Sequence, residues 1–138
     1  MNQNLALDWL KSSYSDIVVI ESILDNSIVT HMTAFHAQQS VEKSLKAILE
    51  YHNEMVPKKH DVLMLKDLVQ KYIIIENESI LEDLNSLYLD SRYPGSFGLL
   101  PYGKPTLQDA NEFYKFAKKT LYDVCALLSI SMEEMQAQ

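Results

Sequence analysis

The chain has 138 residues, about the commonest size of a single domain, so one hydrophobic core is enough to stabilise it. Its 47% hydrophobic and 22% charged residues exclude a disordered chain, and its 3 glycines and 4 prolines are too few for an all-β sandwich. The net charge of -7 disfavours general coating of nucleic acid. Salt screening still allows a local basic patch to bind one nucleotide or one RNA strand.

The sequence predicts a cytoplasmic protein. A single cysteine, Cys125, cannot form an internal disulfide, which fits a reducing compartment. The start of the sequence lacks the pattern of a signal peptide, and no apolar run approaches the roughly 20 residues of a membrane span. We therefore expect no membrane partner.

Apolar residues recur every three or four positions in the first part of the chain, as on one face of a helix. This spacing predicts a helix over residues 4–25 and a second helix from Thr30, as its cap, to about His52. The expected buried stripes are Leu7, Leu10, Tyr14, Ile17, Ile20 and Leu24, then Ala34, Ala37, Val41, Leu45 and Ile48.

Two further helices are expected in the middle of the chain. Asp61 is the predicted cap of a third helix of about 13 residues, whose buried end is the run 73–75. A fourth helix opens at Ser79 and runs to Ser91.

Glycine and proline gather in the predicted loop 91–105, after which Thr106 and Asp109 resemble a capping box that opens a fifth helix. The tail 131–138 is predicted to be frayed. The stripe of the fifth helix is Ala110, Phe113, Ala117, Leu121, Val124 and Leu128.

These elements predict one all-α domain over residues 1–138, a five-helix antiparallel up-and-down bundle. Amphipathic helices joined mostly by short connections bury their stripes against antiparallel neighbours.

The second predicted helix carries the densest group of polar residues. Gln38, Glu42 and Lys46 share one face at intervals of four. One interpretation is a solvated face with a Glu-to-Lys pair worth about 0.2 to 0.5 kcal/mol. The other is that these side chains line a groove or a self-complementary dimer seam.

Two other segments are candidates for binding an anion. Lys59 and His60 directly precede the predicted helix start at Asp61, where free backbone N–H groups favour an anion, although a surface cap with solvated lysines also explains them. Arg92 is the only arginine in the chain, and its planar fork suits carboxylate or phosphate better than lysine does. It either bonds internally, for example to Glu42 or Asp16, or contacts a ligand beside Tyr93.

The sequence lacks the motifs of several reaction classes. No HExxH motif or Cys/His cluster indicates a metal, no Gly-x-Ser-x-Gly indicates a nucleophile, and the glycine spacing fits no phosphate loop. We therefore expect no metal and no cofactor.

Four segments together resemble the HEPN domain family over nearly the whole chain. They are Trp9-Leu10, the block from Phe35 to Ala47, Lys59-His60-Asp61 and Ser91-Arg92-Tyr93-Pro94. The resemblance implies a five-helix bundle, usually a homodimer, often encoded beside a minimal nucleotidyltransferase in a toxin-antitoxin-like context.

Many members of this family are implicated as metal-independent ribonuclease toxins, with an arginine followed four to six residues later by histidine. Arg92 matches the arginine, but no histidine follows His60 in the sequence. The resemblance therefore favours a non-catalytic dimer that binds a nucleotide or serves a nucleotidyltransferase, with Arg92, Tyr93, His60, Lys46, Glu42, Gln38 and Lys59 at the site. A ribonuclease that uses Arg92 and a dimeric interaction module without a ligand are the alternatives.

Overall fold

The computed structural model describes residues 1–90 and 103–137, so Arg92 and Tyr93 lie outside the described residues. All elements of these two ranges are helices, which confirms the all-α class. Among the same residues, no helix has the length and apolar character that crossing a membrane would require. The elements are α1 (Gln3–Ile23), the 3-10 turn η1 (Ser27–Val29), α2 (Thr30–Tyr51), α3 (Val62–Leu68), α4 (Glu78–Asp90), α5 (Leu107–Leu127) and α6 (Met132–Gln136).

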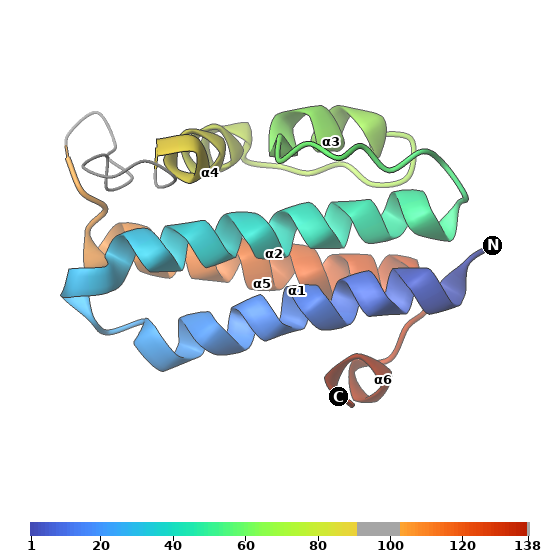
Figure 1. Ribbon diagram of the computed structural model, residues 1–138, viewed down its shortest axis with the longest axis horizontal. Helices are drawn as coiled ribbons and strands as arrows, with labels where there is room; N and C mark the ends of the chain where they lie inside the picture. The colour runs from blue at the N-terminus through green and yellow to red at the C-terminus, as the bar shows by residue number, and fades with distance from the viewer. Residues whose placement is uncertain (91–102, 138) are drawn as a thin grey trace.

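Helix α2 lies at the centre of the bundle and contacts α1, α3, α4 and α5. Figure 1 shows α1, α2 and α5 side by side along the long axis, with α3 and α4 covering another side of α2. Helices α1, α2, α4 and α5 alternate in direction, as an up-and-down bundle requires, and short α3 is added between α2 and α4. Residues on three sides of α2 are therefore covered by other elements.

The predicted stripes form the core. All five predicted stripe residues of α2 are fully buried, and so are Leu10, Ile17 and Ile20 of α1. The six predicted residues of the α5 stripe are also buried. The 3.6-residue period thus identified the faces that the long helices bury against one another.

Two of the predicted helix starts are confirmed. The side chain of Asp61 accepts hydrogen bonds from the backbone N–H groups of Leu63 and Met64, and Thr106 forms a reciprocal capping box with Asp109. Each cap satisfies N–H groups that have no partner within the helix. Thr30, in contrast, does not cap α2, because η1 leads directly into that helix and the Thr30 hydroxyl donates to the carbonyl of Pro105 at 2.7 Å.

The third helix is shorter than predicted. Helix α3 has 7 residues, and the run 73–75 lies outside it, with Ile74 73% exposed. The Tyr72 ring stacks on His52 at 3.9 Å between centroids, and its hydroxyl bonds to Glu54. These contacts hold the chain across the end of α2, while β-branched isoleucines favour the helix only weakly.

The tail is not frayed as predicted. Ser131 and Glu134 form a capping box that opens α6, which contacts α1. Met135 is fully buried, and its sulfur lies 3.4 Å from the Cys125 thiol of α5. The tail therefore adds to the core instead of extending into solvent.

Candidate functional site

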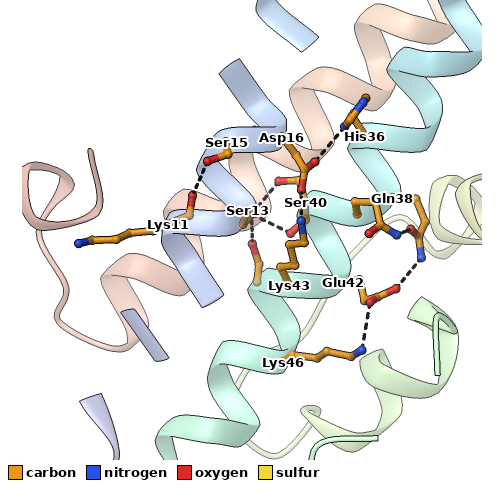
Figure 2. Close-up of polar contacts among 12 residues, drawn as sticks. Lys11, Ser13, Ser15, Asp16, His36, Gln38, Ser40, Glu42, Lys43 and Lys46 are labelled. Atoms are coloured by element: carbon orange, nitrogen blue, oxygen red, sulfur yellow. Dashed lines mark hydrogen bonds and ion pairs between the residues drawn. The ribbon is translucent and has the colours of Figure 1, made fainter. Parts of the chain in front are cut away.

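The polar face of α2 is buried. Gln38, Glu42 and Lys46 are 0%, 3% and 5% exposed, so the interpretation of a solvated face is wrong. The three side chains lie one turn apart and point toward the segment before α3 (Figure 2). A carboxylate and an ammonium buried this deeply need partners, because desolvating each costs several kcal/mol.

The hydrogen bonds of Glu42 provide partners for both ions. Its two carboxylate oxygens accept hydrogen bonds from Gln38 Nε2 at 3.1 Å, Lys46 Nζ at 3.0 Å and His60 Nδ1 at 3.0 Å. Gln38 Nε2 also donates to the backbone carbonyl of His60 at 3.2 Å. We refer to Gln38, Glu42, Lys46 and His60 as the Glu42 cluster.

His60 is the part of the Glu42 cluster that reaches solvent. Its side chain is 43% exposed, whereas that of Glu42 is 4% exposed. Because a carboxylate only accepts hydrogen bonds, Nδ1 of His60 carries the proton in this contact, and Nε2 is the nitrogen left for another partner. Glu42 therefore fixes both the orientation and the tautomer of an imidazole at the surface.

Aromatic rings surround the Glu42 cluster. Tyr88 near the end of α4 lies 5.0 Å from the His60 ring, and Phe35 of α2 stacks on Tyr88 at 5.4 Å. On the other side, Lys46 Nζ lies 5.6 Å from the ring of Trp9, whose indole N–H donates to Glu50. Residues of α1, α2 and α4 thus meet at this point.

Of the remaining predicted site residues, the structure describes Lys59 but not Arg92 or Tyr93. Lys59 is exposed directly before His60 and bears positive charge beside the imidazole. Arg92 and Tyr93 follow the last residue of α4 by two and three positions in the chain, outside the described residues. An internal bond of Arg92 to Glu42 or Asp16 is accordingly an untested prediction.

A second polar cluster was not predicted. Asp16 of α1 accepts from His36 Nδ1 at 2.9 Å and from Lys43 Nζ at 2.8 Å, and we refer to these three residues as the Asp16 cluster (Figure 2). Beside it, the Ser13 hydroxyl contacts both Ser40 and Ser44. The signal was in the sequence, because Ser13 and Asp16 fall within the apolar stripe of α1 and are therefore buried.

The described residues contain no group of three or more His, Cys, Asp or Glu side chains that could hold a metal ion. The two clusters instead combine one carboxylate, one lysine and one histidine each. Such a set can exchange protons through the imidazole and can donate hydrogen bonds to an anion.

A comparison with protein families places this geometry in context. The model of the HEPN domain matches residues 6–126, which include both clusters, all of α2 and α4 and nearly all of α1 and α5. No curated protein and no solved structure matches the chain.

Proposed function

Since the chain belongs to the HEPN domain family, we propose that it is a non-catalytic homodimer that binds a nucleotide or serves as the substrate-binding partner of a minimal nucleotidyltransferase. The supporting observation is the half-exposed His60 imidazole, whose Nδ1 is committed to buried Glu42. A protonated imidazole in this orientation presents Nε2–H to a phosphate oxygen.

Two further charged residues suit a phosphate. Lys59 adds positive charge, and Arg92, close in the chain to the end of α4, adds a guanidinium fork for phosphate. Lys46 and Gln38 do not contact the ligand in this proposal, because both are buried and bond to Glu42. Their role in the proposal is to hold Glu42, and through it His60.

The proposal is tested by titration calorimetry of the purified protein with a panel of nucleoside mono- and triphosphates. We expect His60→Asn and Arg92→Ala to weaken binding at least tenfold, because each removes a charge-assisted hydrogen bond to phosphate. Asn retains a donor near the Nδ1 position and so keeps the contact with Glu42, while Lys119→Ala removes an exposed lysine of α5 as the control. Absence of nucleotide binding, together with failure to co-purify a nucleotidyltransferase, would contradict the proposal.

A dimer is the second part of the proposal. Light scattering coupled to gel filtration gives the mass of the species in solution, with and without nucleotide. A monomer under both conditions would remove the dimer from the proposal but leave nucleotide binding intact.

Ribonuclease activity is a second candidate, and one observation favours it. A histidine oriented by a carboxylate is the arrangement that general bases use, so His60 can replace the histidine missing after Arg92. Cleavage of RNA in EDTA that is lost in His60→Asn and in Arg92→Ala would support this candidate. Intact RNA and normal growth of an expressing host would exclude it.

The third candidate is a dimeric interaction module without a ligand. It predicts that Arg92→Ala lowers the unfolding temperature without changing any ligand equilibrium. Thermal unfolding of wild type and variant against the nucleotide panel distinguishes it, because a ligand present at 100 times its Kd stabilises by about 2.7 kcal/mol.

A further inference from the structure

The Glu42 and Asp16 clusters share one arrangement of atoms. In each, a buried carboxylate accepts from the Nζ of a lysine and from the Nδ1 of a histidine, with all four distances between 2.8 and 3.0 Å. The His36 side chain is 22% exposed and that of His60 is 43% exposed. By the argument given for His60, Nε2 of His36 is also the nitrogen left for another partner.

Both clusters border one stripe of α2. Phe35, Gln39 and Lys43 lie at intervals of four on this helix, and all three are half-buried. His36 lies on the side of the stripe that faces α1, where its partner Asp16 is located. His60 lies on the other side, where its neighbours are α2 and α4.

A row of aromatic rings joins the two histidines across this stripe. The His36 ring packs edge-on against Phe35 at 5.2 Å, Phe35 stacks on Tyr88 at 5.4 Å, and Tyr88 lies 5.0 Å from His60. The two imidazoles are therefore separated by two rings, which is too far for one phosphate group to contact both. Tyr88 is 6% exposed, so half-buried Phe35 is the ring that offers a base a stacking surface. Gln39 Nε2 donates to Gln38 Oε1 at 2.7 Å, which leaves the Gln39 amide oxygen and its second N–H for the edge of a base.

We infer that the ligand site extends from His60 across Phe35 and Gln39 to His36, and that it takes two nucleosides linked through phosphate, with one phosphate group near each imidazole. This inference rests on the proposed nucleotide binding and specifies its ligand class. Lys43 and Lys46 hold the carboxylates that orient the two histidines.

The test compares 5′-phosphorylated adenylyl-adenosine with AMP by titration calorimetry, followed by the corresponding uridine pair. We expect the dinucleotide to bind at least tenfold more tightly than the mononucleotide, because it adds a second charge-assisted contact. His36→Asn, which keeps a donor toward Asp16 but removes Nε2, should abolish this gain and leave the affinity for the mononucleotide unchanged. His36→Gln, whose amide nitrogen reaches farther, should restore part of the gain.

The outcomes separate this inference from the proposed function. If a mononucleotide binds and the dinucleotide binds no better, or if His36→Asn keeps the full gain, the extended site is overturned while nucleotide binding stands. If neither ligand binds, both are overturned. Thermal unfolding of each variant checks that any loss of affinity occurs in a folded protein.

The same chemistry occurs in a free dinucleotide and within a strand of RNA. A hexanucleotide with the same 5′ end distinguishes these two sources. Tighter binding of the hexanucleotide than of the dinucleotide identifies a strand as the ligand, whereas loss of binding on 3′ extension identifies a free dinucleotide.

Discussion

Lys46 and Glu42 show how strongly one residue of the bundle depends on another. Both are at least 95% buried, and the two ions neutralise each other at 3.0 Å, while Gln38 and His60 also donate to Glu42. Lys119 and Asp123 on α5 have the same i, i+4 spacing, but both side chains are exposed. Water screens that pair, and the contribution of exposed pairs to stability is small.

The buried pair leads to a prediction about stability. We expect Glu42→Leu to lower the free energy of unfolding by about 3 to 5 kcal/mol, because it leaves the Lys46 ammonium buried and unpaired. The double variant Glu42→Leu/Lys46→Met should recover most of this loss. Denaturation in urea measures both, and Asp123→Leu is the exposed control, whose midpoint should stay unchanged. A single variant as stable as the double variant would contradict this account.

The sequence grouped Gln38, Glu42, Lys46 and His60, which the structure brings together, but it did not show how deeply they lie. Spacing by four placed Gln38, Glu42 and Lys46 on one face, and the resemblance to HEPN proteins grouped them with His60. It could not show that residues 53–61 and α4 cover this face, since His60 follows its partners Glu42 and Gln38 by 18 and 22 positions and α4 lies still farther along the chain. Burial of a polar face depends on such long-range packing, which no local period reveals.

At the scale of elements, the reciprocal cap of α5 is the clearest agreement between sequence and structure. Thr106 Oγ1 accepts from the Asp109 N–H at 3.0 Å, and the Asp109 carboxylate accepts from the Thr106 N–H at 2.9 Å. All the atoms of this motif lie within four consecutive residues, so the sequence contains the whole signal.

We expect Thr106→Ala to lower the free energy of unfolding by about 1 kcal/mol, the usual cost of removing a cap. Thr106→Ser keeps the hydroxyl and should retain most of the stability. Thermal or urea denaturation measures the difference. Equal stability of the two variants would mean that the cap contributes nothing to the folded protein.

Helices α3 and α6 show where the local signal failed. The apolar period continued past Leu68, but the contacts of Tyr72 with His52 and Glu54 turn the chain away, and these are tertiary contacts. The α6 error is different, because Ser131-x-x-Glu134 was a readable capping box. A helix of 5 residues is too short to persist alone, so its presence depends on burying Met135.

Cys125 reports whether α6 is docked. The thiol is fully buried, and burial raises the pKa of Cys125 to about 11. In the native protein we therefore expect slow reaction with a thiol reagent at pH 8, and a much faster reaction in Met135→Ala, which opens the contact with α6. Leu127→Ala, an exposed change nearby, is the control. Equal rates in wild type and Met135→Ala would contradict docking.

The same pKa gives a dependence of stability on pH. The thiol is protonated in both states below its unfolded pKa near 9, so its contribution is fully present there. As pH rises from about 9 to 11 the unfolded chain loses the proton first, and the free energy of unfolding should fall. Urea midpoints of wild type and Cys125→Ala across this range measure the effect, and parallel curves would contradict it.

The whole molecule is organised around α2, which contributes to the core and to both polar clusters. It contacts every other long helix, whereas α3 has 7 residues and packs mainly against α2 and α4. Stability in such a bundle is not uniform, because a peripheral element can open while the central helices stay packed. The expected difference in stability between α2 and α3 follows from how many helices each contacts, which the spacing of apolar residues in the sequence could not predict.

Native-state hydrogen exchange tests this distribution of stability. Amides in the middle of α2, at Leu45 and Ile48, should exchange only through global unfolding, while those of α3 should exchange through a local opening of lower free energy.

A nucleotide bound at His60 should then slow exchange in α3, because the Asp61 cap directly follows the imidazole and is fixed with it. Exchange measured by mass spectrometry with and without AMP, in wild type and His60→Asn, separates the two effects. If α3 amides were as protected as α2 amides without ligand, the bundle would open as one unit. There would then be no local opening of α3 for a bound nucleotide to slow.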